Sequence, residues 1–355
     1  MWPDRRLCDL LGIEHPIIQA PMAGSATPAL AIAVSDAGGL GSLGCAEMPL
    51  TEIRTVAAAM RAGANRPFNL NFFIYPKPVA DEAVFASARR RLQPWHDELG
   101  LGEPASELPA FHAGFTKAKL DLLLELRPPV VSFHFGLPDD AAVASLKAAG
   151  IILLCTATTV AEAKALQARG VDAIIAQGWE AGGHRGSHRP TAPGQGIGTM
   201  ALVPQVIDAV RLPVIAAGGI GDGRGIAAAL ALGACGVQMG TAFLSCDEAG
   251  TDAARRALLR KAADTDTMVT DAISGRSART FRSRYAEDME RNRQRLPDFP
   301  SLYDLTDPLT GAGQTDVANF HLYGQAAALN VECPAVERVA QLVQETLETL
   351  RRLAW

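Results

Sequence analysis

The segment QGWEAGGHRG, residues 177–186, places a histidine and an arginine among several glycines, directly after the apolar run AIIA. Glycines let the backbone approach a ligand closely because they have no side chain. A histidine has an ordinary pKa of about 6.5, so His184 is suited to removing a proton near neutral pH and to donating a hydrogen bond to a substrate. The segment therefore suggests a turn that approaches a ligand and a histidine that takes part in chemistry, and it leaves the ligand and the reaction open.

Three side chains near this histidine each have two interpretations. Glu180 either orients His184 or holds the loop by accepting backbone N–H groups. Arg185 either attracts an anionic substrate or forms an ion pair with a carboxylate of another segment. His134, in the run VVSFHFG, either contributes to the site or only packs and hydrogen-bonds between its neighbouring phenylalanines. The sequence leaves these alternatives open.

A second group of glycines, with one threonine, suggests a phosphate site. Gly218 and Gly219 follow the apolar run PVIAA, and Gly240 and Thr241 follow GVQM. Backbone N–H groups at such glycines can bind phosphate oxygens, and the threonine hydroxyl can add a hydrogen bond. A tight turn between a strand and a helix is the alternative interpretation of the glycine pair. The stretch GGIGDGRG lacks the GxGxxG order of a dinucleotide-binding fold.

These residues follow short apolar runs that recur along the chain, each with an alanine-rich helical stretch after it. The runs are residues 16–23, 39–44, 68–73, 130–136, 151–158, 173–178, 213–219 and 236–244. Continuous apolar strands that alternate with helices indicate an α/β fold with parallel strands, and eight repeats fit a closed (β/α)8 TIM barrel. The glycine-rich run 39–44 is the weakest of these predicted strands. Without it, an open sheet would be the alternative.

Two long segments interrupt the repeat and predict a second, smaller domain. Residues 76–129 and 245–319 are expected to form a mainly helical insertion domain over the barrel mouth, which serves as a substrate lid. The barrel is then formed by residues 1–75, 130–244 and 320–355. The apolar positions of residues 336–355 have the spacing of an amphipathic helix that closes the barrel.

The active site of a TIM barrel lies where the C-terminal ends of the strands open into loops. Ala20, Pro21 and Met22 end the first predicted strand, Asn71 lies near the end of the third, and Gln177 ends the sixth. A ligand whose phosphate binds at the seventh and eighth strands would extend across the mouth toward these residues. Their amide and backbone groups suit a flat, polar heterocycle, and FMN fits that description.

Six motifs resemble those of the nitronate monooxygenase family, in its class I branch: PIIQAPMAG, NLNFF, VSFHFG, QGWEAGGHRG, AAGGIGDGRG and GVQMGTAFL. The resemblance implies an FMN enzyme that oxidises alkyl nitronates, such as propionate 3-nitronate, with O2 to a carbonyl compound and nitrite. It implies that His184 is the catalytic residue beside the flavin, and that it removes the α-proton in members that accept neutral nitroalkanes. The residues implied to hold FMN are Ala20, Pro21, Met22, Asn71, Gln177, Gly182, Gly183, Gly218, Gly219, Gln238, Gly240 and Thr241.

The same resemblance places a lid tyrosine over the substrate at Tyr303. His134, Arg185 and Tyr303 are therefore the candidate substrate-binding residues. The family pattern has a lysine shortly after this tyrosine, whereas this chain has Asp304 and Asp307. The difference changes the polarity expected of the substrate pocket, and with it the preferred nitronate.

The composition favours a small-molecule partner. The formal net charge is −5 and the basic residues are scattered, which is not the charge distribution of a nucleic-acid-binding protein. The six cysteines are far apart and have no zinc-binding spacing, which favours free thiols in a reducing cytoplasm. No signal pattern and no apolar run of about 18 residues is present. We therefore predict a cytoplasmic monomer or homodimer without a metal ion.

Three other functions are consistent with parts of this pattern. An FMN-dependent NAD(P)H reductase for enoyl thioesters or quinones would use the same barrel but needs room for a nicotinamide over the flavin. An inosine monophosphate dehydrogenase would need a nucleophilic cysteine after the sixth strand, and residues 177–213 contain none. A flavin-binding protein without activity would be unaffected by the loss of His184.

Overall fold

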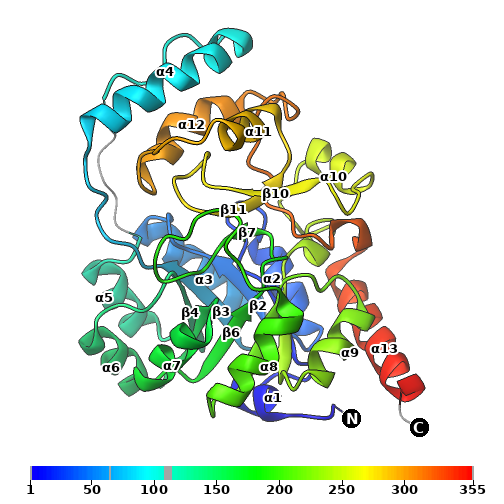
Figure 1. Ribbon diagram of the computed structural model, residues 1–355. Helices are drawn as coiled ribbons and strands as arrows, with labels where there is room; N and C mark the ends of the chain where they lie inside the picture. Colours follow the sequence, from blue (N-terminus) through cyan, green and yellow to red (C-terminus); the bar gives the residue numbers. More distant parts are fainter. Residues whose placement is uncertain (1, 64, 108–113, 354–355) are drawn as a thin grey trace.

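The computed structural model describes residues 2–63, 65–107 and 114–353, and its main element is a closed barrel of eight parallel strands (Figure 1). The strands are β1 (Ile17–Gln19), β2 (Gly41–Gly44), β3 (Phe68–Phe73), β4 (Val130–His134), β5 (Ile152–Ala157), β6 (Ala173–Gln177), β8 (Val214–Ala217) and β9 (Gly236–Met239). They neighbour one another in the order β1-β9-β8-β6-β5-β4-β3-β2. A parallel bridge between Ile18 and Leu40 joins the two ends. The predicted TIM barrel and its eight strands are confirmed.

The packing of helix α2 (Pro28–Asp36) on strand β2 explains why this strand, the weakest of those predicted, contains glycine at position 41. Strand β2 pairs with β3, and Gly41 lies opposite Phe68. A Cβ atom on Gly41 would lie 1.9 Å from the carbonyl oxygen of Ala31, in helix α2. The helix backbone therefore packs directly on the strand, which only glycine permits. The glycines of this run form a strand, and the open-sheet alternative is wrong.

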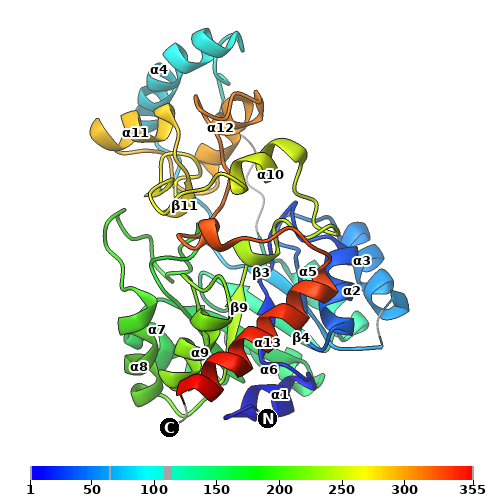
Figure 2. The same cartoon turned by 90° about the vertical axis from the view of Figure 1, so that its right-hand side faces the viewer.

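Helices surround the barrel and are capped by side chains that the sequence supplies. The helices around the strands are α1 (Arg6–Leu11), α2, α3 (Leu50–Gly63), α5 (Lys117–Leu126), α6 (Asp140–Ala148), α7 (Val160–Ala168), α8 (Thr199–Ala209), α9 (Gly223–Ala231) and α13 (Ala335–Leu353). The side chains of Thr27, Thr116, Asp139, Thr159 and Asp222 accept N–H groups in the first turns of α2, α5, α6, α7 and α9. Helix α13 packs against α9 and α2 and so completes the ring (Figure 2).

Apolar side chains alternate along the strands and fill two layers. Ile17 and Val131 belong to the layer between the strands and the surrounding helices. Their chain neighbours Ile18 and Val130 belong to a second cluster, which includes Leu7 of α1. Because successive strand residues point to opposite faces, this second layer fills the barrel interior. Helix α1 closes the end of the barrel that lies away from the insertion (Figure 1).

The two long interruptions contribute a second layer above the barrel mouth (Figures 1 and 2). Its elements are α4 (Glu82–Leu99), α10 (Ala253–Leu259), β10 (Thr267–Thr270), β11 (Ala278–Phe281), α11 (Arg284–Arg291) and α12 (Ser301–Gly311). Helix α5 lies within residues 76–129 but packs against α3 and α6, as a helix of the barrel ring does. Strands β10 and β11 form an antiparallel pair that the sequence analysis did not predict.

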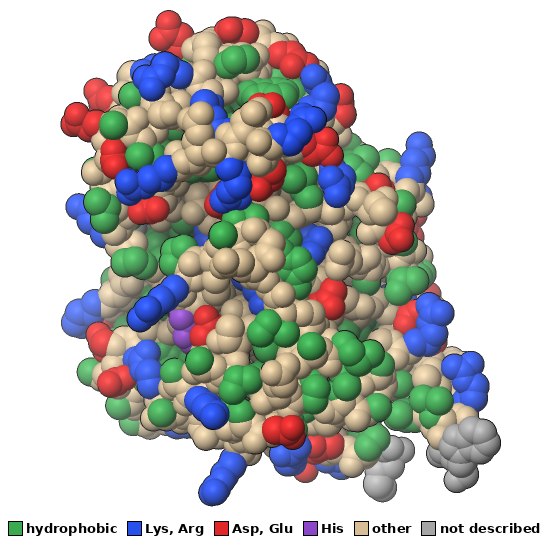
Figure 3. All heavy atoms as spheres, in the orientation of Figure 1, with side chains coloured by type: hydrophobic (Ala, Val, Ile, Leu, Met, Phe, Trp, Pro, Cys, Tyr) green, Lys and Arg blue, Asp and Glu red, His purple; other side chains and the backbone are tan. Residues whose placement is uncertain are grey.

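The surface carries charges of both signs. Lysine, arginine, aspartate and glutamate side chains are interspersed over the face that Figure 3 shows. Among the described residues, no helix combines the length and the apolar character needed to cross a membrane.

Candidate active site

His184 lies where the barrel and the insertion meet. Gly183 and His184 form the two-residue strand β7, which pairs antiparallel with β11 of the insertion. The same segment follows β6 of the barrel, so one short loop belongs to both parts of the fold. Gly183 has a φ of +81°, which a residue with a side chain rarely adopts. The glycine thus lets the chain turn from the barrel strand into the insertion sheet.

Two barrel side chains hold the backbone of His184. His134 Nε2 and Gln177 Nε2 each lie 3.0 Å from the carbonyl oxygen of His184. A carbonyl only accepts, so both nitrogens donate. The other polar atom of each side chain is also hydrogen-bonded. His134 Nδ1 lies 3.0 Å from the hydroxyl of Thr156, and Gln177 Oε1 accepts from the N–H of Gly186 at 2.7 Å. His134 and Gln177 therefore position the backbone of His184, and the polar atoms of both side chains form hydrogen bonds with other protein groups.

The ring of His184 is enclosed by four phenylalanines, here called the aromatic cage. The distance between ring centroids is measured from His184 to each phenylalanine. It is 6.0 Å for Phe73, 5.8 Å for Phe135, 5.3 Å for Phe299 and 5.6 Å for Phe320. The rings meet at 71–88°, the edge-to-face arrangement that aromatic pairs favour. Phe73 ends β3 and Phe135 follows β4, whereas Phe299 lies in the insertion and Phe320 comes directly after residues 245–319, so barrel and insertion segments both build the cage.

The environment of His184 keeps its imidazole neutral. Burial, with smaller contributions from the neighbouring His134 and the charge of Arg276, lowers the pKa of His184 to about 3. Burial likewise lowers the pKa of His134 to about 4. Both rings are therefore neutral over the ordinary pH range. His184 can accept a proton, while both nitrogens of His134 are already hydrogen-bonded.

These two histidines make a prediction about stability. In the unfolded chain they bind protons below a pH of about 6.5, whereas in the folded protein they stay neutral until about pH 4 or 3. The free energy of unfolding is therefore highest above pH 6.5 and falls as the pH decreases toward 4, by roughly 1–2 kcal/mol per histidine at pH 5. Urea unfolding at pH 7 and pH 5 measures this change. A His184→Asn variant should lose less stability than the wild type over the same interval, and an equal loss would contradict the prediction.

A buried arginine of the insertion lies beside the same rings. The guanidinium of Arg276 stacks over the ring of Phe135 at 3.7 Å, and it donates to the carbonyl of Ser187. Its Nε has no hydrogen-bond partner, and no carboxylate of the described residues forms an ion pair with it. Burial lowers the pKa of Arg276 to about 10, so it remains charged at neutral pH. Phe135 has a φ of +72°, which is uncommon for a non-glycine residue, and its ring lies beneath the Arg276 guanidinium.

Replacing Arg276 should change the ionisation of His184. In an Arg276→Gln variant the positive neighbour is gone, so the pKa of His184 should rise from its lowered value while remaining below 6.5, because burial is the larger cause. Histidine NMR titration of wild type and variant measures the shift. A pKa of His184 that falls or stays constant would contradict this account of Arg276.

Arg185 and Glu180 both hold the loop. Arg185 donates to the carbonyls of Gln177 at 2.7 Å and Thr158 at 3.3 Å, and it is 6% exposed. Among the described residues it forms no ion pair with a carboxylate, so that interpretation is wrong, and attraction of an anionic substrate stays a prediction. The carboxylate of Glu180 accepts from the backbone N–H and the hydroxyl of Thr199, both at 2.9 Å. The second interpretation of Glu180 is therefore confirmed: it caps the start of α8.

The glycines at the ends of β8 and β9 form a cradle of bare backbone. Gly218 and Gly219 have φ values of +104° and +72°. A Cβ atom on Gly240 would lie 3.5 Å from the side chains of Ala20 and Met22, which follow β1. Ala20 is held there by a hydrogen bond from its N–H to Met239. The predicted phosphate-binding glycines and the end of β1 thus lie together, and Pro21 lies between Ala20 and Met22.

Three further predicted residues border this cradle. The hydroxyl of Thr241 accepts from the N–H of Gly324 at 2.9 Å, and a Cβ atom on Gly182 would lie 2.6 Å from the same nitrogen. The Oε1 atom of Gln238 is buried without a hydrogen-bond partner. An orphaned buried acceptor at this edge of the barrel is suited to a ligand donor. Asn71 differs, because its amide donates to the hydroxyl and carbonyl of Ser132 on the neighbouring strand.

Tyr303 and His184 both contact the ring of Phe320. Its ring contacts Phe320 of the aromatic cage, with centroids 5.6 Å apart. Burial raises the pKa of Tyr303, and the carboxylates of Glu47, Asp307 and Asp304 raise it further. The phenol thus remains protonated near an acidic rim, which includes Asp304 and Asp307, the two aspartates in the stretch where the family pattern has a lysine.

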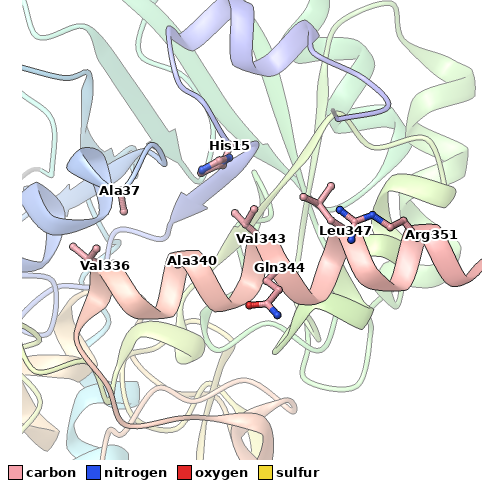
Figure 4. Close-up of a pocket in the computed structure, with 8 residues that line it drawn as sticks. All are labelled: His15, Ala37, Val336, Ala340, Val343, Gln344, Leu347 and Arg351. Carbon is pink, nitrogen blue, oxygen red and sulfur yellow. The ribbon is translucent and has the colours of Figure 1, made fainter.

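A hollow of about 430 Å³ lies elsewhere on the molecule, along α13 (Figure 4). Its lining residues are His15, Ala37, Val336, Ala340, Val343, Gln344, Leu347 and Arg351. None of the candidate catalytic, substrate-binding or FMN-binding residues lines it, so the hollow is separate from the site around His184.

Fold and site together define the class of the protein. A (β/α)8 barrel with a glycine cradle at strands β8 and β9, and a neutral histidine at the end of β6, is an enzyme of the TIM-barrel class with its site at the usual end of the barrel. A family model described as nitronate monooxygenase matches residues 4–345. The chain belongs to the nitronate monooxygenase family, and nitronate monooxygenase activity is its function.

Individual relatives agree with this assignment over nearly the whole chain. The chain is 47% identical to a nitronate monooxygenase of Paraburkholderia phytofirmans, over 98% of this chain and 97% of the relative. It is 45% identical to a nitronate monooxygenase of Pseudomonas aeruginosa, over 96% and 98%. Among solved structures, a nitroalkane oxidase from Streptomyces ansochromogenes is similar, with a TM-score of 0.89, 37% identity, and coverage of 98% of this chain and 100% of that one.

Four residues around His184, in or directly beside the insertion, were not predicted from the sequence. Ser274, Arg276, Phe299 and Phe320 lie in or next to a segment without the strand and helix periodicity of the barrel. The available signals were weak: a serine and an arginine flank Gly275 in the run ISGR, and the phenylalanines follow short polar stretches. Each becomes recognisable only when the segments are placed against the barrel.

Proposed function

We propose that FMN binds across the mouth of this barrel, with its phosphate at the glycines that follow β8 and β9. The cradle of Gly218, Gly219 and Gly240 supports this proposal, because backbone that is free of side chains can approach phosphate oxygens. The unpartnered Oε1 of Gln238 supports it further, since a flavin ring offers N–H donors. Ala20, Pro21, Met22, Gly182, Gly183 and Thr241 would border the bound cofactor. FMN, when bound, would supply the oxidation–reduction chemistry.

The substrates that we propose are alkyl nitronates such as propionate 3-nitronate, oxidised with O2 to a carbonyl compound and nitrite. The observation that carries this proposal is the neutral His184 inside the aromatic cage. A cage of phenyl rings suits a short alkyl chain, and a neutral imidazole can accept a proton from the carbon next to a nitro group. His184 would thus allow neutral nitroalkanes to be used as well, by converting them to nitronates at the site.

The residues around His184 would have different roles in supporting and enclosing it. His134 and Gln177 fix its backbone carbonyl, so the ring projects from a rigid support. The phenyl rings of the cage would limit the access of water to the half-buried imidazole. Tyr303, held at the edge of the cage, would close the site over the substrate and offer a hydroxyl near its polar group. We further propose a cytoplasmic location, which the six free cysteine thiols support, and a monomer or homodimer.

Two measurements test this proposal: identification of the bound cofactor, and identification of the compound that reduces it. The purified protein is denatured, the released cofactor is identified by mass spectrometry, and the intact protein is mixed without oxygen with either ethylnitronate or NADH. We expect FMN, with rapid bleaching of its visible absorbance by ethylnitronate and none by NADH. Bleaching by NADH alone would establish a reductase instead, and a different or absent cofactor would contradict FMN binding.

A further inference from the structure

A serine of the insertion makes the only side-chain hydrogen bond to the ring of His184 among the described residues. Ser274 Oγ lies 2.9 Å from His184 Nε2, and Ser274 is 1% exposed. We propose that Ser274 fixes His184 as the tautomer with its hydrogen on Nε2, so that Nδ1 is the atom that accepts the substrate proton. This inference rests on the proposed role of His184 as a base.

The hydrogen bonds of the serine determine the direction of this interaction. A hydroxyl has one proton to donate and two lone pairs that accept. Ser274 Oγ lies 3.1 Å from the carbonyl oxygen of Arg276, which can only accept, and 3.4 Å from the backbone N–H of Arg276, which can only donate. The hydroxyl therefore donates to the carbonyl and accepts from the amide. Its remaining lone pair accepts the hydrogen on His184 Nε2.

The opposite direction would leave two groups without partners. If the serine proton pointed at Nε2, the Arg276 carbonyl would lose its hydrogen-bond donor, since no other donor in the described part of the chain bonds to it. His184 would then carry its hydrogen on Nδ1, which has no acceptor within the same residues. The Arg276 carbonyl belongs to a residue that is 5% exposed, and loss of its hydrogen-bond donor would cost about 1–3 kcal/mol. A free lone pair on Nδ1 instead is what a base needs.

The insertion holds Ser274 in place from several sides. The hydroxyls of Tyr285 and Thr306 donate to the two carbonyls that precede Ser274, at 2.7 and 2.6 Å. Gly275 has a φ of +82°, and a Cβ atom there would lie 2.4 Å from the carbonyl oxygen of Pro297. The turn that carries the serine is thus tied to α11 and α12 and has no room to shift. Ser274 is a positioning residue, and the insertion would act on the chemistry through it.

Histidine NMR tests the tautomer without any assay of activity. Long-range proton–nitrogen spectra of protein labelled with [15N]histidine show which ring nitrogen carries the hydrogen, and a His184→Ala variant assigns the signals. We expect the Nε2–H form of His184 in the wild type and in Ser274→Thr, which keeps the hydroxyl. In Ser274→Ala we expect a mixture with, or a change to, the Nδ1–H form. An Nδ1–H wild type, or an unchanged tautomer in Ser274→Ala, would overturn the proposal.

Ser277 provides a matched control. It lies in the same turn, is 2% exposed, and donates to the carbonyl of Thr191 at 2.6 Å without contacting a histidine. Ser277→Ala removes a buried hydroxyl that also joins the insertion to the barrel loop. We expect this variant to keep the wild-type tautomer of His184. A change of tautomer here as large as in Ser274→Ala would show a general loosening of the turn and would overturn the specific role of Ser274.

The two substrate forms provide the second readout. Nitroethane requires removal of a proton, whereas ethylnitronate has already lost it. We expect Ser274→Ala to lower kcat/KM for nitroethane about tenfold, part of the ~10²–10⁴-fold that a general base supplies, and to leave ethylnitronate within about twofold. Ser274→Thr should restore nitroethane turnover. An equal fall for both substrates would show a structural role only. If the wild type oxidises neither, the proposed function fails, while the NMR comparison still decides the tautomer.

Discussion

Replacing His184 with alanine is expected to lower kcat/KM for nitroethane by about 10²–10⁴-fold, the range that general-base catalysis contributes. The neutral ring inside the aromatic cage is the base that we propose, and His134 beside it already uses both of its ring nitrogens in hydrogen bonds. With ethylnitronate the loss should be about tenfold or less, since that substrate needs no proton removal. Steady-state nitrite release with each substrate measures both values.

The control for this experiment is a histidine at the other end of the barrel. His15 contacts the ring of Trp2 near α1 and lines the hollow along α13. His15→Ala should leave both substrates within about twofold of the wild type. Equal losses for nitroethane and ethylnitronate in His184→Ala would contradict a role in proton removal and would point to binding alone.

Replacing Gly218 with alanine is expected to weaken FMN binding at least about tenfold, which corresponds to about 1.4 kcal/mol. Gly218 has a φ of +104°, and a Cβ atom there would lie 2.9 Å from the backbone nitrogen of Ala181 and 3.1 Å from the carbonyl oxygen of Gly178. The added methyl would therefore strain the turn and push the loop after β6 away from the cradle. Titration of the FMN-free protein with FMN, followed by fluorescence, gives the Kd.

A Gly170→Ala variant is the control that distinguishes backbone strain alone from damage to the FMN-binding cradle. Gly170 also has a positive φ, +81°, but a Cβ atom there would have no neighbour within 4 Å. It follows α7, away from the strand ends that carry the cradle. Gly170→Ala should lower the melting temperature and leave the Kd for FMN unchanged. A Gly218→Ala protein that binds FMN as tightly as the wild type would show that the cradle is not the phosphate site.

The barrel could be predicted from the sequence because its elements are local and repeated. Each strand is a short, largely buried run, and β1, β4, β5 and β8 are each followed by a barrel helix with a capping side chain, so the pattern is visible without knowing the partners. Even the glycine-rich run 39–44 followed this rule, although its reason, the contact of Gly41 with the backbone of Ala31, appears only in the structure.

The insertion could not be predicted to the same depth because long-range contacts define it. Strands β10 and β11 are four residues each, and their third partner is Gly183–His184, about ninety residues earlier in the chain. A pair of residues has no periodicity that would mark it as a strand. Ser274 likewise became a candidate only because this pairing brings its turn against the ring of His184.

The roles of individual site residues also depended on geometry. The sequence placed His134 and Gln177 at the mouth of the barrel, and they do lie at the ends of β4 and β6. Which atoms they use was not predictable, because both donate to one backbone carbonyl instead of facing outward. Arg185 shows the same limit: a cation beside a catalytic histidine suggests an anionic ligand, but its partners are carbonyls of the protein itself.

Nitrite release from propionate 3-nitronate, by the purified protein with its cofactor in air and without NADH, tests the central claim most directly. The account predicts nitrite formation together with O2 consumption, and no dependence on added NADH. Absence of nitrite, with NADH oxidised by an enoyl thioester or a quinone instead, would contradict it.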